Sequence, residues 1–326
     1  MFSFFRITIF GVIFVIIVLV WAFVFGFTSN QPGSFFNSGH NAVWIGHEWV
    51  GEEKTDVQIQ ELVNTLKNHQ IDTVFVHVGP INSSGSVDPE TYKYSLRFLE
   101  KAKSFEEDID YQAWLGQIRR KLDLADESIR HNISNLSIIL ADVIGFDGIH
   151  FDIEPVWDGD RDFIELLAEV RDDLGEEKKI SVALAELIPQ SILWLSEHVY
   201  SFENYNSEVN FSNVAKYADQ VVAMVYDLGF ESEWFYRWIV TEQTIRITDL
   251  LEGTEVFIAI PSYDVEKEGL SPEVKNVENV ENGLRGIIKG LNNFRSNENN
   301  FAGVAIYSYW ELDEEEWQAY DDLWLK

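Results

Sequence analysis

The 326-residue sequence contains no cysteine, and this absence excludes disulfide bonds, thiolate nucleophiles and cysteine-ligated zinc sites. Basic residues are also scarce, with 24 Lys and Arg against 55 Asp and Glu, so the formal net charge is −31. A surface of this sign repels phosphate backbones and anionic lipid headgroups. Nucleic acid is therefore not an expected partner.

The histidine patterns that ligate metals are missing as well. The chain has seven histidines, but none of them forms a His-x-His pair or a helical His-x-x-x-His pair. His47 and His77 are the pair closest to such a pattern, because both fall in or just after predicted strands. The sequence predicts no metal site and no cofactor.

One long stretch carries no charge. Residues 7–27, "ITIFGVIFVIIVLVWAFVFGF", are long enough as a helix to cross the roughly 30 Å hydrocarbon layer of a bilayer. Arg6 precedes this stretch and no basic residue follows it until Lys54, which predicts a cytoplasmic N-terminus and an extracellular remainder. We interpret residues 1–27 as an uncleaved signal anchor in the cell membrane rather than a cleaved signal peptide, and residues 28–40 as a linker.

The rest of the chain alternates between two hydrophobic periods. Short apolar runs typical of buried strands occur at 42–45, 71–79, 111–116, 146–154, 180–188, 219–227, 255–261 and 302–310. Amphipathic helical stretches lie between them, at 57–70, 128–144, 162–174, 241–251 and 283–294. Eight such units over 41–326 predict a (β/α)8 TIM barrel. A doubly wound open sheet is the alternative, but no glycine-rich phosphate loop follows the first predicted strand.

Polar and aromatic residues follow the predicted strands where the strands end. The active site of a (β/α)8 barrel lies at the carboxyl ends of its strands, so these side chains are expected to converge on one rim. Acids beside aromatic rings are the composition of a carbohydrate-cleaving site. The candidates are Asp152, Glu154, Glu186, Tyr226, Asp227, Tyr263 and Trp310.

Two motifs resemble a known family. "DGIHFDIE" at 147–154 is similar to the DGxDxDxE signature of family 18 glycoside hydrolases, the chitinase family, and "MVYD" at 224–227 is similar to that family's Met-x-Tyr-Asp motif. "GVAIYSYWELD" at 303–313 resembles its closing strand. The resemblance covers roughly residues 40–326 and implies a barrel that hydrolyses glycans containing N-acetylglucosamine.

The resemblance also implies roles for individual residues. Glu154 is expected to act as general acid and then base, and Asp152 to hold the substrate's acetamido N–H. Tyr226 is expected to donate to the acetamido oxygen. The remaining candidates are expected to contact or position the sugar: Asp227, Glu186, Tyr263 and Trp310, the last by stacking under the ring.

One position departs from the family pattern, since His150 occupies the place of the middle aspartate. In the family that aspartate hydrogen-bonds the second acid, so we expect His150 to orient Asp152. The departure leaves two alternatives open. One is an inactive carbohydrate-binding barrel. The other is a glycosidase of another barrel family, with Glu186 or Asp227 as nucleophile or base.

Overall fold

The computed structural model describes residues 29–188, 206–262 and 272–326. In these ranges no helix is long and apolar enough to cross a bilayer. The predicted membrane span at 7–27 lies outside the described residues and stays a prediction.

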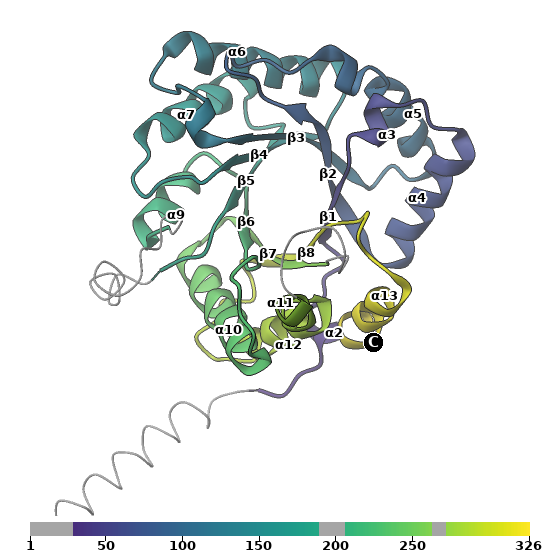
Figure 1. Ribbon diagram of the computed structural model, residues 1–326, viewed down its shortest axis with the longest axis vertical. Helices are drawn as coiled ribbons and strands as arrows, with labels where there is room; N and C mark the ends of the chain where they lie inside the picture. Colours follow the sequence, from purple (N-terminus) through teal and green to yellow (C-terminus); the bar gives the residue numbers. More distant parts are fainter. Residues whose placement is uncertain (1–28, 189–205, 263–271) are drawn as a thin grey trace, which may run out of the picture.

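Eight parallel strands form a closed barrel in chain order, with β1 pairing both β2 and β8 (Figure 1). The predicted (β/α)8 barrel is confirmed. The strands are β1 (Asn41–Ile45), β2 (Ile71–Pro80), β3 (Asp110–Ile118), β4 (Gly148–Glu154), β5 (Lys179–Leu184), β6 (Gln220–Met224), β7 (Glu255–Pro261) and β8 (Phe301–Tyr307). Three predicted strands, 180–188, 219–227 and 302–310, extend three or four residues too far at their carboxyl ends.

Helices surround the barrel (Figure 1). The α-helices are α2 (Gly33–Phe36), α3 (Glu48–Gly51), α4 (Asp56–Asn68), α5 (Ser95–Phe105), α6 (Glu127–Ile138), α7 (Arg161–Leu174), α9 (Glu208–Val214), α10 (Glu233–Leu250), α11 (Pro272–Val277), α12 (Val280–Leu291) and α13 (Glu314–Tyr320). Short 3₁₀ or π turns lie at Pro89–Tyr92, Arg119–Lys121, Ile139–Ile144 and Asp321–Leu325.

Helix α4 shows how local sequence fixes these elements. Thr55 and Gln58 form a capping box that satisfies free backbone N–H groups at its first turn. Ile59, Leu62 and Leu66, spaced at helical intervals, are fully or almost fully buried. This apolar face packs on the outward side chains of the barrel, as the predicted amphipathic pattern requires.

Residues 29–40, within the segment predicted as a linker over 28–40, contact the barrel at several points. The Ser29 N–H donates to the Asn292 backbone carbonyl at 2.8 Å, and Phe36 is buried. Asn41 continues this attachment, since its Oδ1 accepts from Val304 N–H at 3.1 Å and from the Trp324 indole at 2.9 Å. One side chain therefore joins β1, β8 and the C-terminal turn where the barrel closes.

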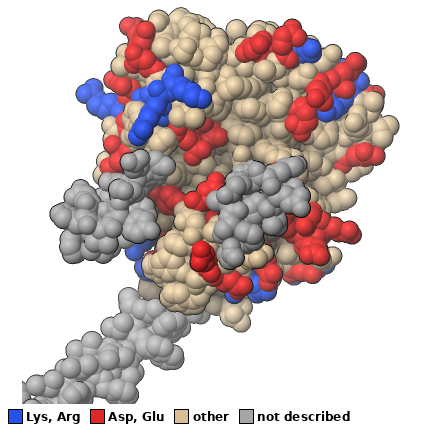
Figure 2. Space-filling view, viewed as in Figure 1, with Lys and Arg blue, Asp and Glu red and all other residues tan. Residues whose placement is uncertain are grey.

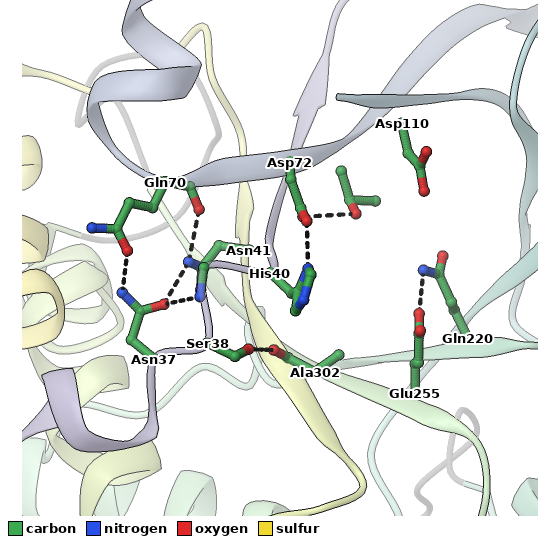
Figure 3. Close-up of polar contacts among 12 residues, drawn as sticks. Asn37, Ser38, His40, Asn41, Gln70, Asp72, Asp110, Gln220, Glu255 and Ala302 are labelled. Carbon is green, nitrogen blue, oxygen red and sulfur yellow. Dashed lines mark hydrogen bonds and ion pairs between the residues drawn. The ribbon is translucent and has the colours of Figure 1, made fainter. Parts of the chain in front are cut away.

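A polar network occupies the amino-terminal end of the barrel (Figure 3). His40 and Asp72 are 2.5 Å apart, and Lys179 bridges Asp110 at 3.1 Å and Glu255 at 3.5 Å. A cavity of about 650 Å³ lies among these groups. The cavity opens at the amino-terminal ends of the strands, which is the opposite end of the barrel from the candidate catalytic residues. Most of the charged side chains named here pair with another charged side chain of the same network.

We predict that Gly303→Ala destabilises the barrel at its closure. A Cβ at this position would lie 1.7 Å from the His40 carbonyl oxygen, and a backbone atom there has little room to move. The expected loss of unfolding free energy is about 3 kcal/mol, measured by urea denaturation. Gly116→Ala is the matched control, because its nearest neighbour would be the Trp114 indole nitrogen at 3.2 Å. Equal stability of the two variants would contradict the prediction.

Candidate active site

Strand β4 supplies the two central carboxylates. Its outward residues Ile149, Phe151 and Ile153 are fully buried under the helices. The alternating residues point into the barrel, and Asp152 and Glu154 come last, at the carboxyl-terminal mouth. The alternation predicted from the sequence is therefore present, and it places both acids at the rim where barrel enzymes carry out their chemistry.

Asp152 and Glu154 form an electrostatically coupled pair. Burial raises the pKa of both carboxyl groups, although Glu154 keeps part of its surface open to solvent at the mouth. A hydrogen bond between them lowers the pKa of Asp152 and raises that of Glu154. The negative charge of Asp152 raises the Glu154 pKa further, so the shared proton resides on Glu154.

The two oxygens of Asp152 have different environments. Oδ2 accepts a hydrogen bond from the indole Nε1–H of Trp114 at 2.9 Å. Oδ1 is buried and has no hydrogen-bond partner among the described residues. A buried acceptor without a donor costs free energy, so the position of Asp152 leaves one of its acceptor oxygens unused.

His150 does not orient Asp152, which corrects the expectation from the sequence. Its Nε2 accepts from the Trp44 indole at 3.1 Å, so in the neutral ring Nδ1 carries the proton and donates to Ser181 Oγ at 2.8 Å. The ring also stacks on Phe75, with centroids 3.8 Å apart. Full burial lowers the His150 pKa to about 3, so the imidazole is a neutral part of the barrel interior.

Tyr226 and Asp227 lie in the loop after β6. The Tyr226 ring stacks on Tyr307, with a centroid distance of 5.4 Å and an interplanar angle of 8°. Asp227, three residues past the end of β6, has a φ of 60°, a left-handed conformation that aspartate adopts more readily than most residues. Glu278 fixes the loop, since its carboxylate accepts N–H groups from Leu228 at 3.1 Å and Phe230 at 2.8 Å.

Two further carboxylates lie at the mouth, Glu186 after β5 and Asp227 after β6. Burial raises the pKa of Glu186 to about 7, and the charges of Glu278 and Asp227 add to this shift. Asp227 and Glu186 likewise raise the pKa of Glu154. Figure 2 shows acidic side chains spread over this view of the molecule, with basic ones in a few small groups. This carboxylate environment favours the protonated state of Glu154 at neutral pH.

The aromatic residue at the end of β8 is Tyr307 rather than Trp310. The Tyr307 ring contacts Trp44 at 5.7 Å and Trp114 at 6.3 Å, which places it in the barrel interior beneath the mouth. Trp310 lies three residues beyond the strand, is 41% exposed and meets the Tyr307 ring edge at 5.6 Å. Tyr263 lies outside the described residues.

Sequence reasoning missed Trp114, Tyr307 and Glu278. The alternation of the strands could have indicated the first two, because every second residue faces the barrel interior. On β3 the inward residues include Gln112 and Trp114, and on β8 they include Ala305 and Tyr307. Glu278 carried no comparable signal, because it bonds a loop about 50 residues earlier in the chain.

In the part of the chain that the structure describes, no group of three or more His, Asp or Glu side chains could hold a metal ion. His47 and His77 lie with their rings 5.9 Å apart near the mouth. Burial, together with the His47 charge, lowers the His77 pKa to about 4. His77 packs on Trp114, with ring centroids 4.5 Å apart, and is a neutral wall residue of the site.

No protein-family model and no curated protein matches the sequence. Solved structures do match its fold. The chain superposes on a family GH18 chitinase from Cycas revoluta in complex with allosamidin (TM-score 0.60, 15% identity, 87% of this chain and 99% of that chain). It also superposes on the Ostrinia furnacalis Group IV chitinase (0.59, 12%, 88% and 100%) and the Bacillus cereus spore cortex-lytic enzyme SleL (0.58, 12%, 86% and 73%). The chain thus has the barrel fold of the family 18 structures that its motifs resemble.

We predict that His150 makes the fold sensitive to acid. Its folded pKa of about 3 lies below the value near 6.5 of an unfolded histidine, so its contribution to stability is complete above pH 6.5 and is lost as pH falls toward 3. Between pH 7 and pH 4 the wild type should lose about 3 kcal/mol relative to His150→Gln, measured by urea denaturation. Other titrating groups are shared by both proteins and cancel. A difference that does not change with pH would refute this.

Proposed function

We propose that the chain is a glycoside hydrolase that cleaves glycans containing N-acetylglucosamine, by a retaining mechanism in which the substrate's own acetamido group attacks. The observation that carries this proposal is the Asp152–Glu154 pair, with the shared proton on Glu154 and one Asp152 oxygen left without a partner. Family 18 enzymes use the acetamido group in place of a protein nucleophile, and the motif and the fold both support that comparison.

Glu154 supplies the proton. Held protonated by burial and by the charge of Asp152, it protonates the departing glycosidic oxygen as the C1–O bond breaks. The acetamido carbonyl oxygen then bonds to C1 and forms an oxazolinium ion. The ionised Glu154 next removes a proton from the water that attacks C1 from the same side as the departed group. The bond between C1 and the acetamido oxygen breaks, the acetamido group is regenerated, and the configuration at C1 is retained.

Asp152 orients and stabilises the attacking group. Its Oδ1 accepts the acetamido N–H, and its negative charge stabilises the positive oxazolinium. The Tyr226 hydroxyl donates to the acetamido oxygen. The stacked Tyr307 ring forms the floor under the sugar, and Trp310 contacts it from the rim. Asp227 and Glu186 bind sugar hydroxyls from the next two strands.

Two kinds of glycan fit this chemistry. One structural neighbour is described in complex with (GlcNAc)4, and another is a spore cortex-lytic enzyme. The acetamido group at the cleaved residue is the feature that the mechanism needs. We therefore propose chitin-like or peptidoglycan-like chains as the substrate class.

We also propose that residues 7–27 anchor the enzyme in a membrane with the barrel outside the cell. Support comes from the lack of charge in this stretch and from the position of Arg6 before it. The contacts of the first described residues support the orientation. Ser29 bonds to Asn292, in the segment between α12 and β8, which is at the amino-terminal end of the barrel. An anchor that ends at residue 27 therefore leaves from the end opposite the catalytic mouth, which faces away from the bilayer.

We predict that Glu154→Gln lowers kcat by about 10²–10⁴-fold, because an amide cannot donate the catalytic proton. Binding of an N-acetylglucosamine oligomer should persist, measured by calorimetry beside hydrolysis of a fluorogenic oligomer. Glu100→Gln, at an exposed position on the outer helix α5, is the matched control and should retain turnover. Full activity of Glu154→Gln would eliminate the assignment, and a wild type that binds without hydrolysis would indicate a carbohydrate-binding barrel.

A thiazoline derived from N-acetylglucosamine should inhibit the wild type, because its ring mimics the oxazolinium intermediate. Inhibition is measured as a competitive Ki with the fluorogenic oligomer. Loss of turnover in Glu186→Gln together with no thiazoline inhibition would instead support a glycosidase with a protein nucleophile.

The absence of cysteine allows a direct test of orientation. Asn299 lies near the amino-terminal end of the barrel and Glu231 near the carboxyl-terminal end. The variants Asn299→Cys and Glu231→Cys each introduce one labelling site. With the full chain in liposomes, a fluorophore at residue 299 should be quenched more strongly by nitroxide lipids than one at residue 231. Equal quenching, or the reverse order, would contradict the proposed orientation.

A further inference from the structure

Asp152 needs a fixed orientation to receive the acetamido group, but His150, the residue expected to hold it, bonds other side chains. In the family that the motif resembles, an acid at the position of His150 hydrogen-bonds the second carboxylate. Here both His150 nitrogens are taken by Trp44 and Ser181. The orienting group must therefore come from another strand.

Trp114 on β3 is in that position. Its register partner on β4 is His150, and the following pair is Gly116 with Asp152, so the indole reaches along the barrel wall toward the mouth. Nε1–H lies 2.9 Å from Asp152 Oδ2. The ring is 8% exposed and is held against His77 at 4.5 Å. Packing on these neighbours prevents the donor from rotating away.

We propose that Trp114 is the positioning residue that orients Asp152 for the acetamido group, in place of the acid that the family has at position 150. This inference rests on the proposed function. Because Oδ2 is held by the indole, Oδ1 is the oxygen left to receive the substrate N–H.

Replacing a buried acid with the Trp114 indole as the partner of Asp152 changes which groups of the site can bind a proton. A buried acid behind Asp152 can take up its proton, whereas an indole N–H donates only and does not titrate. His150 is also closed to this proton, since Nε2 and Nδ1 both have partners. Among the described residues, Glu154 is therefore the carboxyl group that exchanges a proton with Asp152.

Among the described residues, the charged and titratable groups around Asp152 include three acids and one histidine. Glu154 follows Asp152 on the same strand, Glu186 follows β5 and Asp227 follows β6, and all three are acids. His77 lies behind the Trp114 ring on β2. Removing the indole donor makes the ionised form of Asp152 less stable, so the Asp152 pKa rises.

The test compares Trp114→Phe with Trp44→Phe in the full chain. Both residues are interior tryptophans whose Nε1–H donates to a β4 side chain, but Trp44 donates to His150. Trp114→Phe should lose at least about tenfold in kcat with KM changed less than about threefold, as expected when one hydrogen bond to a charged group is lost. Its acidic limb in the pH–rate profile should move to higher pH. Trp44→Phe should stay within about threefold in kcat with an unshifted profile.

Two further measurements keep the outcome decisive. If Trp114→Phe fails to fold, benzothienylalanine at position 114 keeps the ring shape and removes only the N–H, and the same losses are expected. Carboxyl ¹³C NMR of Asp152 should show a raised pKa in the Trp114 variant alone, and this readout does not depend on turnover. A wild type without activity would therefore overturn the proposed function. Identical pH profiles and Asp152 titrations in both tryptophan variants would overturn the role of Trp114.

Discussion

One proton shared between two neighbouring carboxyl groups is the constraint on which the site depends. Asp152 and Glu154 point the same way because they are two residues apart on one strand. Two charges so close are costly in a partly buried site, and one carboxyl keeps its proton instead. The hydrogen bond between them decides which one, because it lowers the pKa of Asp152 and raises that of Glu154. An acid and an anion then stand side by side at neutral pH.

The fold and the position of this pair could be predicted from the sequence because both follow from local periodicity. Alternation in "GIHFDIE" sets which side chains face the barrel, and eight strand-like runs set the architecture. Strand ends were less predictable. Tyr226 and Tyr307 continue the apolar pattern into the mouth, so 219–227 and 302–310 read as longer strands. The strand β6 already ends at Met224, and Asp227 takes a left-handed conformation three residues later, which composition does not reveal.

The partners of inward side chains could not be predicted, because they depend on which residues of distant strands reach the same level in the barrel. Trp44 and His150 are 106 positions apart, and Trp114 and Asp152 are 38 positions apart. The motif suggested a His150–Asp152 contact, because the aspartate that the family has at this position hydrogen-bonds the second acid. Each hydrogen-bonds a different tryptophan instead, His150 with Trp44 and Asp152 with Trp114. The site therefore has the two acids of the motif that it resembles but supports them differently.

The excess of acidic residues in the chain also affects the protonation of the site. Burial is the first cause of the raised Glu154 pKa, and the neighbouring acids Asp152, Asp227 and Glu186 add to it in the same direction. A basic side chain beside any of them would stabilise the ionised state and work against proton donation. Arg119, which follows β3 at the same end of the barrel, pairs with Asp160 at 2.6 Å and 4% exposure. Its charge is thereby neutralised, and the mouth stays an environment that favours the protonated form of a carboxylic acid.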